Sequence, residues 1–333
     1  MTVATPTLSA PNLAHAVSAD VLRRAAFAVG KRLFAAVAVV FGAATLGFLA
    51  LQLLPGDPVD WLLGPSMTAS PTLRAQVRAD YGFDRPVFEQ YLSYLNQLLH
   101  GHLGSSYQLQ QPVATLILDQ LAPTAELAVA ALLLALFIAV AVAVSTAGRR
   151  PRLRAGASTA ELVITSAPQY WVGILLLTAF SFQLQIFPVA GAQTPAALVL
   201  PAITLALSIA GVLSQVLREG LEAALTQPFI VTARARGSSL SAVRLRHALR
   251  HAGAPMLTLT GWLTGSLLGG VVPVESVFGR PGIGALVLQA VTSRDMPIVM
   301  GVILLSAVVF VVISTLVDLL HLALDPRIRT NGD

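Results

Sequence analysis

The chain has 333 residues, of which 55% are hydrophobic and only 11% are charged. Soluble domains carry roughly 25% charged residues, so this composition excludes an ordinary soluble protein. The formal net charge is +5 and cysteine is absent, which excludes a disulfide framework and a thiolate metal site.

Apolar runs dominate the sequence. A helix needs about 20 predominantly apolar residues to cross a bilayer. Six runs reach that length, at residues 34–54, 124–146, 160–183, 198–217, 254–274 and 298–321. We therefore expect an all-α integral membrane protein with six transmembrane helices. The expected segments are a tail over 1–32, a first span over 33–54, an external region over 55–123, a core with the other five spans over 124–329, and a tail over 330–333.

The N-terminal tail does not have the pattern of a cleaved signal peptide. No apolar core precedes the pair Arg23-Arg24, and the segment ends in a second basic pair, Lys31-Arg32. We expect a tail that leads directly into the first span.

The external region predicts short helices. Ser70 is a candidate N-cap, and Pro71 suits the first position of a helix that ends near Gly82. A second, amphipathic helix is expected over residues 87–99, and PVATLILDQL is a third candidate. The apolar stripe of the second helix comprises Phe88, Tyr91, Leu92, Leu95, Leu98 and Leu99. Because about 68 residues cannot build a large core, we expect a small helical cap on the membrane face.

The basic residues predict the orientation. With the N-terminus in the cytoplasm, sixteen Lys and Arg residues fall on the cytoplasmic side and five on the outside. This bias favours cytoplasmic positions for both termini. The same division of charge among several loops disfavours a nucleic-acid-binding surface, which would gather basic and aromatic residues in one patch.

The cytoplasmic loop over residues 218–252 is unusually dense in arginine. Gly237 interrupts it, and the stretches on both sides have a helical pattern. Ser238, Ser239 or Ser241 could cap the second stretch, and Leu240 and Val243 would offer apolar contacts. The pattern predicts a cytoplasmic helix–turn–helix that docks a partner. A simple basic loop that only fixes the topology is the alternative.

The sequence lacks the residues for nucleotide chemistry. Its one lysine, Lys31, is followed by Arg32, whereas a phosphate-binding P-loop needs Lys followed by Ser or Thr. ATP chemistry would therefore belong to another chain. His247 and His251 share a helix face, but the arginines around them would repel a divalent cation. We therefore expect no metal site in this chain.

Two acidic residues lie near the ends of spans. Glu275 is at the outer end of the fifth apolar run and Asp318 near the inner end of the sixth. Acidic residues in membranes are often functional, but both positions are close enough to an edge to be hydrated. Glu219 and Glu222 are expected to pair locally with Arg218. The glycine-rich FGRPGIG segment is expected to form a turn.

Several segments together resemble one protein family. They are LLPGDP at 53–58, YGFDRPVFEQY at 81–91, HLGSSY at 102–107, LAPTAEL at 121–127, TARARG at 232–237, HALRHAGAPML at 247–257, VESVFGRPGIG at 274–284, SRDMP at 293–297 and LVDLLHLALDPRIR at 316–329. In this order they resemble the B-type permease of the ABC-transporter family that imports dipeptides, oligopeptides or nickel. The sequence departs from the family pattern at His102, Ser314 and Asp119-Gln120.

The resemblance implies a fold and a set of partners. The fold would be that of a type I ABC importer permease. The partners would be a second homologous permease subunit, two ATPase subunits that bind ATP and Mg²⁺, an extracytoplasmic substrate-binding protein and the lipid bilayer. The chain itself would be a non-catalytic subunit without a cofactor, in the inner membrane of a bacterium, and the substrate would be a short peptide.

The resemblance also implies a coupling helix near Gly237–Arg246, which would sit in a groove of the ATPase. The residues implied for coupling are Thr232, Ala233, Arg234, Ala235, Arg236, Gly237, Ser238, Leu240, Val243, Arg244, Arg246 and His247. Alternatives are a nickel or metallophore importer, an ion-coupled secondary transporter and a membrane scaffold. A secondary transporter would need acidic residues near the membrane midplane, and it would leave the arginine-rich loop without a task.

Overall fold

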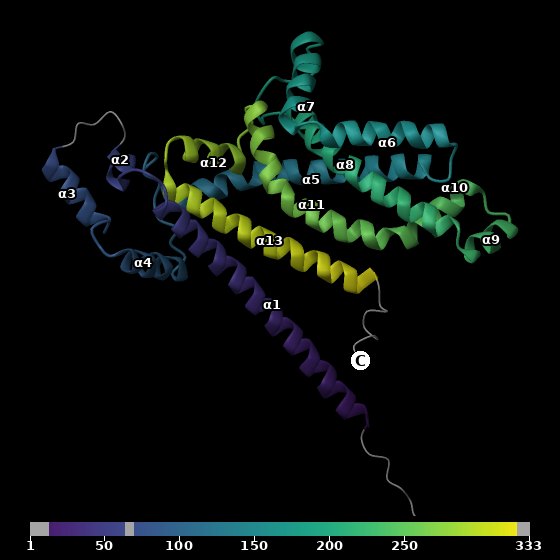
Figure 1. Ribbon diagram of the computed structural model, residues 1–333, viewed down its shortest axis with the longest axis horizontal. Coiled ribbons are helices and arrows are strands. Elements are labelled where there is room, and N and C mark those ends of the chain that lie inside the picture. The colour runs from purple at the N-terminus through teal and green to yellow at the C-terminus, as the bar shows by residue number, and fades with distance from the viewer. Residues whose placement is uncertain (1–12, 64–69, 325–333) are drawn as a thin grey trace, which may run out of the picture.

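A computed structural model describes residues 13–63 and 70–324 (Figure 1). In these two ranges the chain is helical, and its only β-type pairing is an isolated bridge between Ser105 and Pro112. The elements are α1 (Leu13–Gln52), α2 (Pro58–Leu63), α3 (Pro71–Asp80), α4 (Val87–Leu99), α5 (Val113–Thr146), α6 (Pro151–Ser166), α7 (Gln169–Leu176), η1 (Leu177–Gln183), α8 (Ala196–Leu225), α9 (Pro228–Ala235), α10 (Leu240–Ala242), η2 (Val243–Ala248), α11 (Leu249–Val277), α12 (Ile283–Thr292) and α13 (Met296–Leu324). The elements η1 and η2 are π-helical.

The centre of the bundle is the packing of α5 against α8 (Figure 1). The buried face of α5 carries an alanine at every fourth position: Ala131, Ala135, Ala139 and Ala143. Small side chains let two helix backbones approach closely, which is how membrane helices associate without a hydrophobic drive from water. On α8, the larger side chains of Leu205, Leu213 and Leu217 fill the same core. Helix α11 also packs against α8.

Four helices in the described ranges are long and apolar enough to cross a membrane. They are residues 29–52 of α1, α5, α8 and residues 296–319 of α13. The fifth predicted run, 254–274, lies inside the 29-residue helix α11, which is not among these four. The described part of the chain therefore confirms a helical membrane protein, while the count of six spans stays a prediction.

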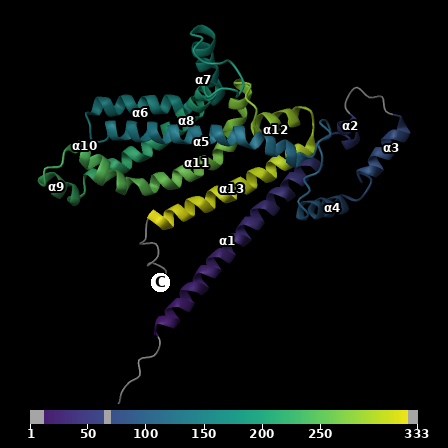
Figure 2. The same cartoon turned by 180° about the vertical axis from the view of Figure 1, so that it is seen from behind.

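The third predicted span is not one straight helix. Between α6 and the α7–η1 segment the chain bends by 101°. The cause is Pro168: it lacks a backbone N–H, and it pushes the preceding Ala167 into an extended conformation. Helix α6 follows the bundle, whereas α7 rises away from it in both views (Figure 2).

Helices α1 and α13 lie side by side in both views (Figure 2). The guanidinium of Arg32 pairs with the carboxylate of Asp318 at 2.7 Å. Further along, Gly47 faces Met300, and an added Cβ on this glycine would lie 2.9 Å from the methionine sulfur. Helix α1 already begins at Leu13, so the helix extends well into the predicted N-terminal tail. The predicted C-terminal tail lies outside the described residues.

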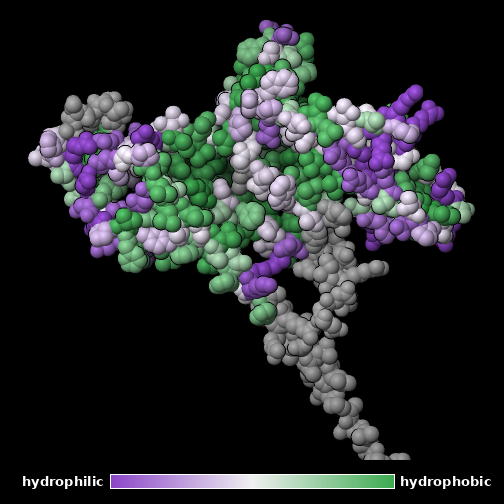
Figure 3. Space-filling view, viewed as in Figure 1, coloured by the Kyte–Doolittle hydropathy of each residue, from purple (hydrophilic) through white to green (hydrophobic). Residues whose placement is uncertain are grey.

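The two ends of the bundle are polar and the middle is apolar (Figure 3). Hydrophilic residues gather at the end with α9 and α10 and at the opposite end with α2 and α3. This distribution is that of a protein which crosses a membrane along the bundle.

The cap matches the sequence prediction in part. Ser70 caps α3 as expected, because its hydroxyl accepts a hydrogen bond from the backbone N–H of Leu73. Helix α4 also forms as expected and packs on α1. The third candidate helix is not separate: it is the beginning of α5, which runs without a break through Pro123.

Candidate functional site

The arginine-rich segment forms one end of the bundle. Helix α9 follows α8 after two residues, and its first residue is Pro228. Gly237 then turns the chain with a φ of +86°, a conformation that residues with a Cβ rarely adopt. Of the three candidate capping serines, Ser239 caps the next helix by accepting from the N–H of Ala242. The predicted helix–turn–helix is therefore present.

The boundaries of its second helix differ from the prediction. The segment Gly237–Arg246 was expected to form a separate coupling helix, but α10, η2 and α11 follow one another without a gap. The short separate helix is α9, on the N-terminal side of Gly237. Any displacement of residues 240–248 thus acts directly on α11.

One face of this segment is buried in the chain's own core. Val243 is fully buried and forms a small cluster with Ile230 and Ala233, and Phe229 and Leu225 pack against it. The expectation that Val243 is an apolar contact for a partner is therefore wrong: its side chain holds α9 against η2.

Arg244 is also buried, with an exposed fraction of 4%. Its terminal nitrogen donates to the carbonyl oxygen of Gly148 at 3.5 Å, and its Nε has no partner among the described residues. Burial lowers the pKa of Arg244, and the nearby charge of Arg149 adds to this effect. Arg244 was expected to pair with a partner, but it connects residues 228–248, which we call the coupling segment after their expected role, to the loop that follows α5.

The opposite face is exposed. Of the predicted coupling residues, the exposed ones are Thr232, Arg234, Ala235, Arg236, Gly237, Leu240, Arg246 and His247, with Ser238 half-buried and Ala233 buried. Two exposed apolar residues were missed: Val231, with an exposed fraction of 70%, and Leu245. The signal for Val231 was present, since Phe229, Ile230 and Val231 are consecutive and cannot all face one side of a helix.

The two histidines of this region have different surroundings. The ring of His251 lies 4.5 Å from that of Phe229, while His247 is exposed. Within residues 13–63 and 70–324, no group of three or more metal-binding side chains is close enough to hold an ion.

A buried ion pair connects α8 to α6. The guanidinium of Arg218 on α8 donates to both carboxylate oxygens of Glu161 on α6, at 2.7 and 2.6 Å. The hydroxyl of Ser214 donates to the same carboxylate, and Arg218 also donates to Ser158. The prediction that Arg218 pairs with Glu219 or Glu222 is therefore wrong, because its partner is Glu161. Nothing in the sequence indicated a partner 57 residues away.

Glu222 makes a different contact. Its carboxylate pairs with Arg154 at the beginning of α6, at 3.2 Å. Together with Arg218–Glu161, this ion pair connects α6 to α8 at two levels.

Glu275 is fully buried near the C-terminal end of α11, so the expectation that it is hydrated is wrong. Its carboxylate accepts from the hydroxyl of Thr124 at 2.6 Å and from the backbone N–H of Ala285 at 3.0 Å. The N–H groups at the start of a helix have no partner within it, so this carboxylate caps α12. A Cβ at Gly282 would lie only 2.0 Å from the carboxylate, which explains this glycine of the predicted FGRPGIG turn.

A second buried carboxylate, Asp295, holds the cap. It accepts from the hydroxyl of Ser106 and from the backbone N–H groups of Tyr107 and Gln108. Burial, with smaller contributions from Tyr81 and Asp295, raises the pKa of Tyr107 to about 12, so its hydroxyl stays neutral at physiological pH. Two of the segments quoted above, HLGSSY and SRDMP, therefore meet in space.

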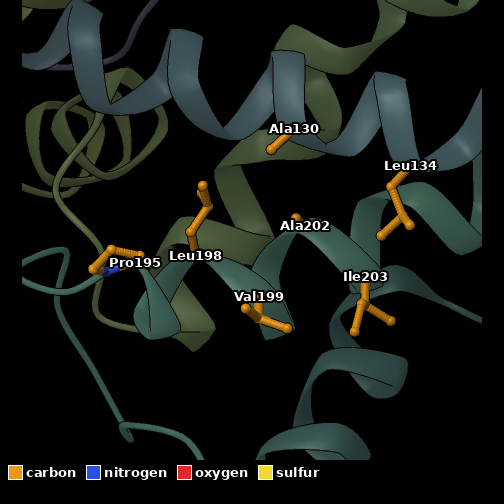
Figure 4. A pocket seen from close by; sticks show the side chains of 7 residues that line it. All are labelled: Ala130, Leu134, Pro195, Leu198, Val199, Ala202 and Ile203. Atoms are coloured by element: carbon orange, nitrogen blue, oxygen red, sulfur yellow. The ribbon is translucent and has the colours of Figure 1, made fainter.

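An apolar hollow of about 340 Å³ lies between α5 and α8 (Figure 4). It is lined by Ala130 and Leu134 from α5 and by Pro195, Leu198, Val199, Ala202 and Ile203 at and after the start of α8. None of these side chains carries a polar atom, so the hollow suits an apolar group and offers nothing to a charged ligand.

Comparison with known proteins places these features in a family. Residues 131–330 match the family described as "Binding-protein-dependent transport system inner membrane component", and residues 26–128 match its N-terminal part. A protein of Brucella abortus (strain 2308) named as a peptide transport system permease is 36% identical over 308 residues, with 90% of this chain and 98% of that protein covered. The glutathione transport system permease protein GsiC of Salmonella choleraesuis is 35% identical over 301 residues, with 90% and 97% covered. A crystal structure of an amino acid ABC transporter with histidines overlaps 62% of this chain and 94% of that one, at 20% identity and a TM-score of 0.48.

Proposed function

Because this chain belongs to the family of inner-membrane components of binding-protein-dependent transport systems, we propose that it forms half of the translocation pathway of an ABC importer for short peptides. Its relatives are named for peptide and glutathione transport, and glutathione is itself a tripeptide. The second half of the pathway would come from a homologous permease subunit. An extracytoplasmic binding protein would deliver the substrate.

The chain's own role is mechanical. It is a non-catalytic subunit, and ATP and Mg²⁺ bind to separate ATPase subunits, because its one lysine lies outside any P-loop pattern. We place both termini and the coupling segment in the cytoplasm, from the excess of basic residues on that side.

The observation that carries this proposal is the division of the coupling segment into two faces. The buried face, with Val243, fixes the segment to the bundle. The exposed residues include Val231 and Leu240, and the exposed arginines are Arg234, Arg236 and Arg246. Arginine is enriched in binding hot spots, and guanidinium groups pair well with carboxylates of a partner.

The same segment is connected to three helices of the bundle. It follows α8 after two residues, it continues into α11 without a gap, and Arg244 reaches the loop after α5. A movement of the ATPase that shifts the exposed face would therefore act on α5, α8 and α11 together. These helices form the central core, so the shift would reach the pathway.

The test uses the complete importer, with both permeases, both ATPases and the binding protein, in proteoliposomes. We expect ATP-dependent uptake of labelled di- and tripeptides. The double variant Val231→Asp, Leu240→Asp should reach the membrane in normal amount but lose ATPase co-purification and uptake. Leu153→Asp adds a charge at an exposed apolar residue on the same side, outside the segment, and should behave like the parent.

Two results would contradict the proposal. Normal uptake by the double variant would show that this face does not dock the ATPase. Uptake of nickel without uptake of peptides would agree with an importer but contradict the proposal that its substrate is a peptide.

A further inference from the structure

Helix α4 in the cap has one broad apolar face, and the bundle covers only part of it. Tyr91, Tyr94 and Leu95 are half-buried, whereas Phe88, Leu92 and Leu99 are exposed. At 100° per residue the three exposed residues lie within about 40° of one another around the helix axis. We call these three residues the outer stripe.

The covered face fixes α4 to the outer end of α1. The hydroxyls of Tyr91 and Thr45 are hydrogen-bonded at 2.7 Å, and the ring of Phe48 lies 5.3 Å from Tyr91 and 5.8 Å from Tyr94. Near the end of α1, the side-chain Nε2 of Gln52 donates a hydrogen bond to the side-chain Oε1 of Gln90 at 3.4 Å. Three successive turns of α1 thus contact α4.

These contacts place α4 at the depth of the lipid boundary. The apolar part of α1 ends at Gln52, and Thr45 lies seven residues before it, which is about 10 Å along the helix. An interfacial amphipathic helix buries its apolar face by about 5–10 Å between headgroups and acyl chains. The contact with Thr45 therefore holds α4 where such helices lie.

The surroundings of the outer stripe fit the same position. Leu46 and Leu49 of α1, and Leu53 directly after it, are exposed beside the residues that α4 contacts, so the apolar surface continues from the span. The stripe contains no charged residue. The polar residues of α4 occupy the adjoining side of the helix, within about 120° of one another: Glu89, Gln90, Ser93, Asn96 and Gln97.

We propose that α4 is an interfacial helix of the outer leaflet and that the outer stripe is inserted among lipid chains. The helix then holds the cap at a fixed height above the membrane. A protein partner is disfavoured as the occupant, because a stripe continuous with a membrane span at this depth meets lipid first. The proposal concerns the cap and does not depend on which substrate the importer carries.

The test uses single cysteines, which this chain allows because it has none of its own. Leu92→Cys and Ser93→Cys are neighbours that face different sides of α4. Each carries a nitroxide label in the complete importer, in nanodiscs, with cysteines of the other subunits replaced. Accessibility of the label to oxygen, which concentrates in lipid, is compared with accessibility to a water-soluble nickel chelate.

We expect the label at Leu92 to favour oxygen and to be protected from the nickel chelate, and the label at Ser93 to show the reverse. Leu99→Cys should repeat the result for Leu92. Equal access of the chelate to both labels would place the stripe in water and overturn the proposal. Protection of Leu92 that appears only when the binding protein is added would identify a protein-docking surface, and it would overturn the proposal as well.

Discussion

The carboxylate of Asp295 accepts a hydrogen bond from the hydroxyl of Ser106, although 189 residues separate them. Ser106 belongs to the loop before α5, and Asp295 to the turn before α13. Because the carboxylate also accepts hydrogen bonds from the backbone N–H groups of Tyr107 and Gln108, one buried side chain defines the path of the cap loop.

Asp295→Asn should loosen this loop. An amide offers one acceptor oxygen in place of two, so at least one backbone N–H loses its partner, at a cost of about 1–3 kcal/mol. Hydrogen exchange of the Tyr107 and Gln108 amides should become faster. Ser106→Ala leaves the carboxylate in place and should keep both amides protected. The role assigned to Asp295 would be contradicted if the two variants exchanged alike.

Glu161 and Arg218 should behave as a coupled pair. Removal of one member of a buried ion pair leaves the other charge without compensation and costs about 3–5 kcal/mol, whereas replacement of both by apolar residues is often neutral. We expect Arg218→Met and Glu161→Met each to lower the unfolding temperature of the purified protein. The double variant should recover most of the loss, as measured by tryptophan fluorescence during heating. A double variant less stable than both single ones would argue against the pairing.

The effect of a substitution at Gly237 should depend only on how readily the new residue adopts a positive φ. An added Cβ would meet nothing within 4 Å, so no clash is involved. At a φ of +86° a β-branched side chain is strongly disfavoured, whereas asparagine adopts positive φ more readily. Gly237→Val should therefore disturb the exposed face and weaken ATPase binding by about tenfold, equivalent to about 1.4 kcal/mol. Gly237→Asn is the matched control and should bind nearly as the parent does.

The orientation can be tested with labels at two exposed positions. Ser241 lies on α10 in the coupling segment, and Gln76 lies on α3 in the cap. In intact cells, a membrane-impermeant thiol reagent should label Gln76→Cys and spare Ser241→Cys, because the basic residues favour a cytoplasmic coupling segment. Permeabilised cells provide the control, since both positions should then react. Labelling of Ser241→Cys in intact cells would reverse the orientation.

Local features were predictable from the sequence. The cap of α3 at Ser70 and the turn at Gly237 depend on neighbouring residues only, and both appear where expected. The bend at Pro168 was visible as a proline, but the apolar residues on both sides of it suggested one continuous span. Hydropathy measures the affinity of a segment for lipid, and it contains no information on whether the helix axis continues straight or bends.

Contacts between distant segments were not predictable. Arg218 has acidic neighbours in sequence, and only the packing of α6 on α8 brings Glu161 closer to it. Arg244 was taken for a surface charge because most arginines are exposed, yet the fold buries it beside Gly148. A single sequence shows which residues are unusual, but the pairs they form depend on the fold.

Helix α5 is longer than the membrane is thick. Its 34 residues extend over about 51 Å, against a hydrocarbon core of about 30 Å. Its C-terminal end is followed by Gly148, which Arg244 contacts, and at its N-terminal end the N–H of Val113 donates to the carbonyl oxygen of Gly104 in the cap loop. A tilt of this helix about its centre would move both ends in opposite directions. With the coupling segment placed in the cytoplasm, as proposed, a movement there that tilts α5 would also displace the cap loop at the other end of the helix.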